Sequence, residues 1–465
     1  MYQLDFNNPI HVYFSGIGGI SMSGLAQILK SKGFKVSGSD RAASSITDAL
    51  AADGIDVIIG QTKENITPDI DLVVFTAAIR PDNPEYIAVM ENDIPHINRS
   101  VLLGQIMRGY KLPVAISGTH GKTTTTSMIS EIMMEAGTDP TLSIGGILDS
   151  IGGNVRIGHS DYFAAEACEY TNSFLDMFPG IGIILDIDAD HLDFFKDLDD
   201  IRHSFRKFAQ LIPADGALII NTQIPDYEEI SGGLDCDVIL YGPDDKADYW
   251  PEDITYDKFA HASYTLCSRS ADGTVRRQAV SLSVPGEHNV YNSMAAAAAA
   301  DRLGIDRAHT AAALKKYVGT ERRFQVLGTR NGFTVVDDYA HHPTEIEATL
   351  RTAQNYPHRD LWCVFQSHTY TRTKALMDEF ARALTLADHV ILAKIYPARE
   401  TDNLGISSHT LAEKIEKLGH PCLCLDNFEE IESYLLQNCQ SDDLVITMGA
   451  GNINEVGIKL VSGDH

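Results

Sequence analysis

The sequence has few of the features that are typical of secreted, zinc-stabilised or membrane-spanning proteins. Seven cysteines are scattered over 465 residues, and no two of them form a CxxC pair. We therefore expect neither a zinc site nor a disulfide framework, and a reducing compartment is favoured. The first ten residues include Asp5 and lack a basic segment followed by an apolar one, so no signal peptide is expected. No apolar run reaches the roughly 20 residues of a membrane span, which predicts a cytoplasmic protein with no membrane partner.

Basic charge is also scarce. The chain has 37 Lys and Arg against 64 Asp and Glu, a formal net charge of −27. Binding to nucleic acid needs clustered basic side chains that neutralise phosphates, so we expect no nucleic-acid partner. A phosphate ligand would have to bind in a local pocket and not on a broad basic face.

Apolar, β-rich runs alternate with helix-like stretches along almost the whole chain. This alternation predicts α/β layers with largely parallel sheets, and the length predicts two to four domains. Boundaries are expected near Met107–Pro113 and Val318–Arg322, and Cys236–Leu282 has the short alternating pieces of an antiparallel appendage. The predicted strands are His11–Ser15, Lys35–Gly38, Val57–Gly60, Asp71–Ala77, Val114–Ser117, Tyr162–Ala165, Ile181–Ile187, Ala217–Asn221, Thr334–Asp337, Trp362–Gln366, His389–Ile395 and Leu444–Thr447.

A glycine-rich loop, Gly118–Thr123, lies between a predicted strand and a predicted helix over Thr124–Met134. Backbone N–H groups in such a loop and the helix N-terminus favour a bound phosphate. Lys122 is placed to reach phosphate oxygens, and the Thr123 hydroxyl to hold Mg²⁺. The general GxxxxGK[ST] spacing would need a glycine where Ile116 stands, so this is a shorter form of the motif. The alternative is an ordinary strand–helix turn.

A second glycine motif follows the first predicted strand. Gly16 and Gly18 fit the dinucleotide pattern GxGxxG, Ser21 replaces its third glycine, and Asp40 lies 24 residues after Gly16. Such a site would hold a pyrophosphate on a helix N-terminus and a ribose on the acid. NAD and a diphosphate-linked sugar meet this requirement equally, and a glycine turn without a ligand remains the third interpretation.

Further polar residues follow predicted strands or open predicted helices. Glu166 and His191 end strands beside the phosphate loop and would suit Mg²⁺; singly, each has the pattern of a surface acid or an ordinary histidine. Asn289 and Asn292 share a helix face, unless Asn289 is only a helix cap. Three other candidates lie near the second boundary: Arg323 for phosphates, Asp338 for a ribose, and the pair His341-His342 for an acidic substrate or as a pH-sensitive surface loop.

Taken in order, these segments resemble the Mur ligase family, and within it the branch that adds L-alanine. The resemblance covers nearly the whole chain through HVYFSGIGGISMSGLA, VSGSD, GTHGKTTTT, AEACEYTNSFL, DIDADHLD, PGEHNVYNSMAA, ERRFQVLG, VDDYAHHPTEI, FQSHTYTRT and TMGAGNI.

The resemblance implies three α/β domains. A Rossmann-like domain over residues 1–112 would bind the UDP-sugar, a P-loop domain with the antiparallel appendage over 113–320 would bind ATP, and a Rossmann-like domain over 321–465 would bind the amino acid. It implies ATP and Mg²⁺ as cofactors, UDP-N-acetylmuramate and L-alanine as partners, and a monomer or weak homodimer. The implied reaction is amide formation through an acyl phosphate.

The resemblance also assigns residues. The implied ATP site comprises Gly118, Thr119, His120, Gly121, Lys122, Thr123, Thr124, Asn289, Asn292, Arg323 and Asp338. The implied UDP-sugar site comprises Gly16, Gly18, Gly19, Ser21, Asp40 and Thr76. Magnesium would be held by Thr123, Glu166 and His191. The catalytic group would be Lys122, Glu166, His191, His341 and Arg372, of which His341 and Arg372 would contact the acyl or amino-acid side.

Three positions depart from the family pattern: Cys168 and Thr369 stand where an Asp and an Arg are usual, and Asp186 replaces an Asn. Thr369 leaves Arg372 as the main candidate for binding a carboxylate. No lysine lies between Glu166 and His191, which fits the L-alanine-adding branch. The alternatives are a ligase that recycles a murein tripeptide, an NAD-dependent oxidoreductase and a non-catalytic nucleotide-binding regulator.

Overall fold

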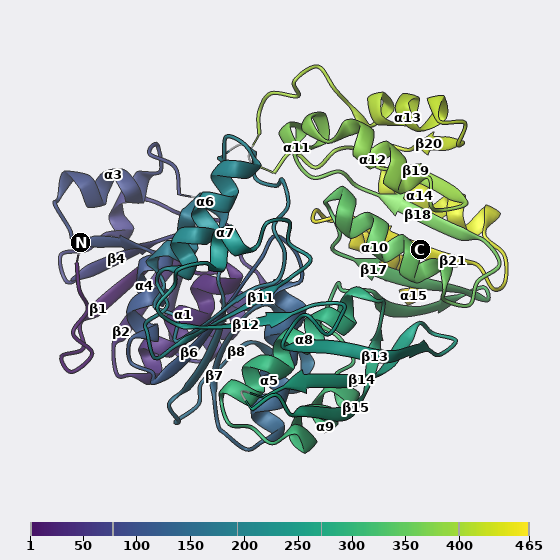
Figure 1. The fold of residues 1–465 in the computed structure, drawn as a ribbon. Coiled ribbons are helices and arrows are strands. Elements are labelled where there is room, and N and C mark those ends of the chain that lie inside the picture. The colour runs from purple at the N-terminus through teal and green to yellow at the C-terminus, as the bar shows by residue number, and fades with distance from the viewer. Residues whose placement is uncertain (1, 77–78, 193, 271, 399, 464–465) are drawn as a thin grey trace.

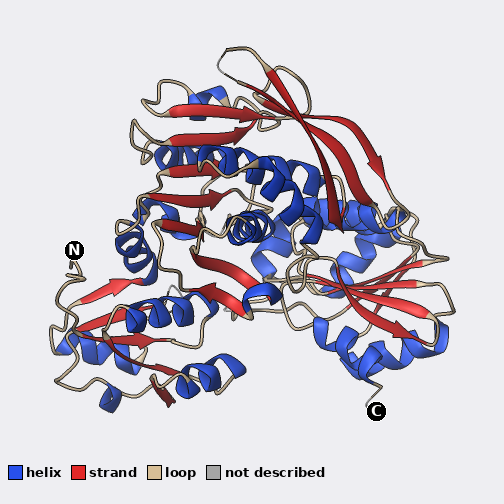
Figure 2. Cartoon of the chain, turned by 90° about the horizontal axis from the view of Figure 1, so that it is seen from below, coloured by secondary structure: helices blue, strands red, loops and turns tan. Residues whose placement is uncertain are grey.

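Three β-sheets follow one another along the chain, each packed with helices (Figures 1 and 2). The computed structural model describes residues 2–76, 79–192, 194–270, 272–398 and 400–463. The mixed α/β class with three sheet-containing parts confirms the predicted fold class. The exact domain limits stay a prediction.

The first sheet is parallel, with strand order β3-β2-β1-β4-β5. Its strands are β1 (His11–Ser15), β2 (Lys35–Asp40), β3 (Asp56–Ile59), β4 (Leu72–Phe75) and β5 (His96–Asn98), and its helices are α1 (Ile20–Ser31), α2 (Ser45–Ala52), α3 (Pro84–Glu91) and α4 (Arg99–Met107). Every residue of β1 is buried, as expected for a central parallel strand. The predicted strand at Asp71–Ala77 is shorter, and its end at Ala77 lies outside the described residues.

The central sheet has ten strands in the order β15-β14-β13-β12-β11-β10-β6-β9-β7-β8. They are β6 (Leu112–Ser117), β7 (Thr141–Leu148), β8 (Gly153–Arg156), β9 (Tyr162–Glu166), β10 (Ile181–Ile184), β11 (Ala217–Asn221), β12 (Asp237–Tyr241), β13 (Tyr249–Tyr256), β14 (His261–Arg269) and β15 (Val275–Pro285). Its helices are α5 (Lys122–Glu135), α6 (Leu198–Ala209), α7 (Glu228–Ser231), α8 (His288–Arg302) and α9 (Arg307–Lys316).

The antiparallel appendage exists, but the predicted limits, Cys236–Leu282, were wrong. Strand β12 pairs in parallel with β11, and the antiparallel pairs are β13–β14 and β14–β15, which together span Tyr249–Pro285. The crossover into β12 contains only the one-turn helix α7. Four residues are too few to show a helical period, so the sequence pattern placed the end of the alternating strands and helices too early.

The C-terminal sheet has the order β16-β17-β21-β18-β19-β20. Its strands are β16 (Gln325–Arg330), β17 (Phe333–Asp338), β18 (Leu361–Phe365), β19 (His389–Leu392), β20 (Cys422–Cys424) and β21 (Leu444–Met448), and its helices are α10 (Pro343–Gln354), α11 (Tyr370–Ala375), α12 (Met377–Leu384), α13 (Ser408–Lys417), α14 (Phe428–Asn438) and α15 (Asn454–Ser462). Only β16 is antiparallel to its neighbour. The sequence analysis missed β16, although Asn331-Gly332 has positive φ at both residues, which is typical of a tight hairpin turn.

Helices cover both faces of this third sheet. In β18, Cys363 and Phe365 belong to one apolar cluster with α10, α12 and α13, whereas Trp362 and Val364 belong to another with α14 and α15. This alternation is the period of two that a strand buried on both faces must have. Strand β18 is therefore fixed in register by both layers.

Small side chains bring α5 and α8 together under the central sheet. Ala295–Ala300 are all buried in the cluster that also contains Met128 and Ile132 of α5. The alanine run is a tightly packed helix, as predicted, and it sets the distance between the phosphate loop and Asn289-Asn292. Within the described part of the chain, no helix has the length and apolar character needed to cross a membrane.

Candidate active site

The phosphate loop lies between β6 and α5 and depends on two glycines. Gly118 and Gly121 have φ of 139° and 79°, which favour glycine. A Cβ on Gly121 would lie 2.8 Å from Asn292 Oδ1, and one on Gly118 would lie 2.9 Å from Asp186 Oδ1. Helix α5 begins at Lys122, two residues before the predicted start, so Lys122 and Thr123 belong to its first turn. The positive end of the helix therefore faces the loop.

Lys122 is held inside this loop by a carboxylate. Its Nζ donates to Glu169 Oε2 at 2.9 Å and to the carbonyl oxygen of Thr119 at 3.0 Å. Burial opposes the charge on Lys122, but the charge and hydrogen bond of Glu169 together with the charge of Asp186 outweigh burial and raise the pKa of Lys122. Glu169 is itself almost fully buried. The sequence analysis did not single out Glu169, although it lies in the AEACEYTNSFL motif beside Glu166.

The three predicted magnesium ligands come from segments near the phosphate loop: Thr123 from the first turn of α5, Glu166 from the end of β9 beside β6, and His191 from the segment after β10. Glu166 Oε1 accepts a hydrogen bond from Gly145 N at 2.6 Å, which leaves Oε2 for a cation. A Cβ on the adjacent Gly146 would lie 3.1 Å from Thr123 Cγ2, so the β7 backbone also contacts Thr123. His191 Nε2 lies 3.6 Å from Glu169 Oε1.

Chemically, this group suits a divalent cation. Burial lowers the pKa of His191, so its imidazole is neutral and has a lone pair to offer. Carboxylate and hydroxyl oxygens, which Mg²⁺ prefers, come from Glu166 and Thr123. The residues present therefore fit the implied metal, and their assignment as ligands stays a prediction.

A cavity of about 230 Å³ opens beside the phosphate loop. Seven predicted ATP-binding residues line it: His120, Gly121, Thr124, Asn289, Asn292, Arg323 and Asp338. Asn292 Nδ2 donates to Asn289 Oδ1 at 3.0 Å, and the residue that caps α8 is Glu287, so the interpretation of Asn289 as a helix cap was wrong. The sequence analysis missed the aromatic lining, Tyr241, Tyr291, Tyr317 and Phe324. Rings and amides of this kind suit a nucleotide base.

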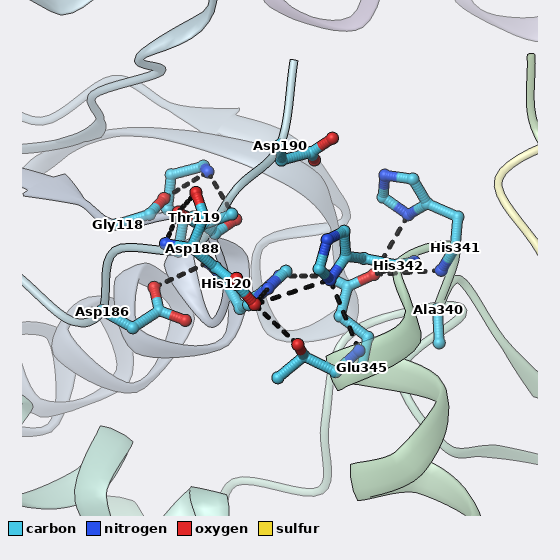
Figure 3. Close-up of polar contacts among 12 residues, drawn as sticks. Gly118, Thr119, His120, Asp186, Asp188, Asp190, Ala340, His341, His342 and Glu345 are labelled. Atoms are coloured by element: carbon cyan, nitrogen blue, oxygen red, sulfur yellow. Dashed lines mark hydrogen bonds and ion pairs between the residues drawn. The ribbon is translucent and has the colours of Figure 1, made fainter. Parts of the chain in front are cut away.

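The C-terminal sheet closes over the central one through ion pairs (Figure 3). Arg372 Nε donates to Asp190 Oδ1 at 2.9 Å, and both side chains are largely buried. His120 Nδ1 lies 3.1 Å from Glu345 Oε1, and the Thr344 hydroxyl donates to Asp188 Oδ2 at 2.6 Å. The carboxylates Asp188 and Asp190 follow β10, whereas Thr344, Glu345 and Arg372 belong to α10 and α11. These contacts join residues more than 150 positions apart.

The predicted acyl-side residues lie at this junction. Arg372 and His191 line one pocket together with Tyr170, His368 and Glu400. His341 lies beside that group: its ring centroid is 6.1 Å from that of His368, and His368 Nδ1 is 3.4 Å from Arg372 Nη1. His341 N also donates to Glu345 Oε2. The histidine pair is thus part of a junction and not an exposed loop.

Four of the six predicted UDP-sugar residues line one pocket. Gly16, Gly19, Asp40 and Thr76 line a pocket with Gln61 and Arg80. Gly18 and Ser21 do not line it: Gly18 N donates to Asp40 Oδ2 at 2.9 Å, and Ser21 Oγ accepts a hydrogen bond from Arg99 Nη1 at 2.7 Å. Asp40 therefore has one carboxylate oxygen engaged with the glycine turn. Arg99 and Arg80 are the basic side chains here that the sequence analysis missed.

Comparison with known proteins adds independent evidence. Three family models match successive parts of the chain: Mur ligase family, catalytic domain, over residues 11–111; Mur ligase middle domain over 116–300; and Mur ligase, glutamate ligase domain, over 322–451. The chain belongs to the Mur ligase family. This Mur ligase is 58% identical over 462 residues to the UDP-N-acetylmuramate–L-alanine ligase of Lachnospira eligens, a match that covers 99% of this chain and all of the relative.

Two further comparisons agree with that result. The UDP-N-acetylmuramate–L-alanine ligase of Agathobacter rectalis is 55% identical over 461 residues, which cover 99% of this chain and all of that protein. The crystal structure of UDP-N-acetylmuramate-alanine ligase from Thermotoga maritima is 28% identical, with a TM-score of 0.81 and coverage of 98% of this chain and 99% of that one. The resemblance to the Mur ligase family is thereby confirmed.

The three departures from the family pattern now have local explanations. Asp186 Oδ1 accepts a hydrogen bond from His120 N at 2.8 Å and so shapes the phosphate loop of this Mur ligase. Thr369 has φ of 68° and caps α11, its Oγ1 accepting from Arg372 N. Cys168 lies beside the Lys122–Glu169 pair, and burial raises its pKa to about 11, so it stays a neutral thiol.

Lowering the pH below about 6 is expected to raise the KM for ATP. Burial raises the pKa of Asp338 to about 6, although Arg323 and the N–H groups of Phe324 and Ala340 favour its charged form. Above that pKa the carboxylate is charged and accepts hydrogen bonds from a ribose; below it, a proton occupies one acceptor site. Steady-state kinetics between about pH 5 and 8 test this. In Asp338→Asn the KM should be high and lose the step near pH 6; a step as large as in the wild type would contradict the assignment.

Proposed function

We propose that this Mur ligase joins the amine of L-alanine to the lactyl carboxylate of UDP-N-acetylmuramate, with cleavage of ATP to ADP and phosphate, as a step of peptidoglycan precursor synthesis. The observation that carries the proposal is the convergence of the phosphate loop, Glu166, His191 and Arg372 where the C-terminal sheet closes on the central one. The whole-length similarity to L-alanine ligases supports the same substrates.

The first chemical step is phosphoryl transfer. A lactyl carboxylate oxygen attacks the γ-phosphorus of ATP, the bond to the β–γ bridging oxygen breaks, and an acyl phosphate and ADP form. Lys122 leaves Glu169 and neutralises the phosphate oxygens, while the N–H groups at the start of α5 bind them. Mg²⁺ bound by Thr123, Glu166 and His191 would neutralise charge on the transferring phosphate.

Amide formation is the second step. The uncharged amine of L-alanine attacks the acyl carbon, and a tetrahedral intermediate collapses with loss of phosphate. The pocket that holds His191, Arg372 and Glu400 is the place for the amino acid, with Arg372 facing its carboxylate. The Asp190–Arg372 and His120–Glu345 pairs hold the junction closed, which keeps water away from the acyl phosphate.

One assay separates this reaction from its alternatives. Phosphate release from ATP is measured with UDP-N-acetylmuramate present and with L-alanine, glycine, L-serine or murein tripeptide as acceptor. We expect the largest kcat/KM with L-alanine. Release with the tripeptide alone would make the enzyme a recycling ligase, and no release with any acceptor together with tight NAD binding would favour an oxidoreductase.

The proposed reaction also bears on the cellular compartment and on the oligomeric state. We place the reaction in the cytoplasm, where ATP and reducing conditions are available, and all seven cysteines are free thiols. A monomer or weak homodimer is sufficient, since all proposed site residues come from one chain.

A further inference from the structure

Two histidines and a carboxylate meet at the junction between the central and C-terminal sheets, apart from the predicted magnesium group. His120 Nε2 lies 3.4 Å from Asp188 Oδ2, and His342 Nδ1 lies 3.7 Å from the same oxygen. One ligand atom from each of these residues lies within 4.8 Å of the other two. The described residues contain no other group of three His, Cys, Asp or Glu side chains as close as this.

These separations suit a small tetrahedral cation. Zinc bonds of about 2.0–2.2 Å place neighbouring ligand atoms roughly 3.3–3.6 Å apart. The two distances to Asp188 Oδ2 are already near that value, and the third pair of ligand atoms lies within 4.8 Å. Imidazole nitrogens favour Zn²⁺ and its neighbours over Mg²⁺, which prefers six oxygens.

The hydrogen bonds of His342 show which ring nitrogen has the lone pair. Its Nε2 donates to the carbonyl oxygen of Ala189 at 3.3 Å, so the lone pair is on Nδ1. That lone pair accepts the long 3.4 Å hydrogen bond from Thr344 N, which a metal ion would replace. Burial lowers the pKa of His342, so the ring stays neutral.

His120 has the outer partner that metal-binding histidines usually have. Its Nδ1 lies 3.1 Å from Glu345 Oε1, and Glu345 is itself anchored by His341 N at 3.0 Å. A carboxylate on one ring nitrogen orients the ring and makes the opposite nitrogen a stronger ligand. Here the opposite nitrogen is Nε2, the atom that faces Asp188.

We propose that His120, Asp188 and His342 bind Zn²⁺. The bound ion inhibits the enzyme because it holds the C-terminal sheet against the phosphate loop. His120 and Asp188 belong to the central part of the chain, whereas His342 caps α10 of the C-terminal part. An ion bound by both parts stabilises the closed arrangement by the difference between its affinities for the closed and the open arrangement. Opening, which substrate entry and product release require, becomes correspondingly slower.

Protons compete with the ion for this site. Asp186, Asp188 and Glu345 outweigh the effect of burial and raise the pKa of His120 well above its ordinary value, while the neutral His342 is the other ring beside it. A metal ion binds only the neutral form of an imidazole, so it would replace a proton on His120.

The test uses the full-length enzyme with Co²⁺ as a visible probe and Zn²⁺ as competitor. Wild-type protein should bind Co²⁺ with the intense absorption of a four-coordinate site, and Zn²⁺ should abolish that absorption. His342→Asn should weaken binding at least tenfold, the lower end of what the loss of a partner at a metal site costs. Asparagine is a good helix N-cap, so α10 keeps its start. Unchanged affinity in His342→Asn would overturn the proposal.

Two matched variants locate the ion. His409→Asn alters an exposed histidine of α13, and His191→Asn removes the imidazole of the predicted magnesium group; both should bind Co²⁺ as the wild type does. Loss of binding in His191→Asn alone would place the ion in the magnesium group and contradict the proposal. Zn²⁺ should also slow phosphate release in excess Mg²⁺, and less so in His342→Asn than in the wild type. Co²⁺ binding is measured by absorption, without turnover. A failure to bind Co²⁺ can therefore be told apart from a failure of the proposed ligase reaction.

Discussion

Replacing Lys122 with alanine is expected to lower the rate of phosphate release by about 1000-fold or more. The variant loses the lysine ammonium of the phosphate loop, whose Nζ lies 2.9 Å from Glu169 Oε2 and would exchange that carboxylate for phosphate. Loss of a single well-placed donor costs roughly 100- to 1000-fold, and loss of a full charge costs more. Initial rates at saturating UDP-N-acetylmuramate and L-alanine measure the effect.

Two controls accompany Lys122→Ala. Removing one partner of a buried pair costs about 3–5 kcal/mol, so Glu169 would destabilise the variant. The double variant Lys122→Ala/Glu169→Gln relieves that penalty and should regain thermal stability without regaining activity. Lys196→Ala, at an exposed lysine after His191, should behave as the wild type. Binding of the UDP-sugar should survive in Lys122→Ala; equal loss of binding and turnover would argue against separate sites.

Replacing Arg372 with alanine is expected to lower kcat/KM for L-alanine by about 100-fold, which corresponds to about 2.7 kcal/mol. Arg372 has two proposed roles, to face the amino-acid carboxylate and to hold Asp190 across the junction. Burial opposes the charge of Asp190, and the guanidinium of Arg372, together with His191 and His341, overcomes burial and keeps the pKa of Asp190 low. Without the guanidinium a buried carboxylate is left unpaired, and closure becomes less favourable.

The matched control for Arg372→Ala is Arg382→Ala. Arg382 lies on the next helix, is largely exposed and pairs with Glu379 in the same turn, so its loss should change little. Arg372→Lys should recover only part of the activity, because an ammonium does not form a two-pronged contact with a carboxylate. If Arg372→Ala matched Arg382→Ala in kcat/KM for L-alanine, the assignment of Arg372 would be wrong.

Local sequence patterns predicted the strand–loop–helix units well. The limits of β1 and β11 agree with prediction, because an apolar run followed by a glycine or a polar turn has few other structures. Elements without a period of their own were missed, such as β16, or given wrong pairing, such as β12 behind the one-turn α7. The sequence predicted β18 as a strand. That its alternate residues pack against different helix layers is shown only by the structure.

Candidate residues that lie together in one segment of the sequence could be predicted. Contacts that form only where the C-terminal sheet packs against the central one were missed. Lys122 and Thr123 belong to one loop, so the motif alone placed them. The pairing of Arg372 with Asp190 joins residues 182 positions apart, and that of His120 with Glu345 joins residues 225 apart. No single sequence encodes such pairs by spacing. Glu169 was missed for a different reason: a buried acid that holds a lysine has the same local pattern as a surface acid.

The central claim, that the acyl group is activated by phosphate transfer, has a direct isotopic test. UDP-N-acetylmuramate labelled with ¹⁸O in its lactyl carboxylate is turned over with ATP and L-alanine, and the released phosphate is analysed by mass spectrometry. Attack of the carboxylate on the γ-phosphorus predicts transfer of one labelled oxygen to each phosphate, with ADP as the other product. Unlabelled phosphate, or label in AMP, would contradict the proposed mechanism.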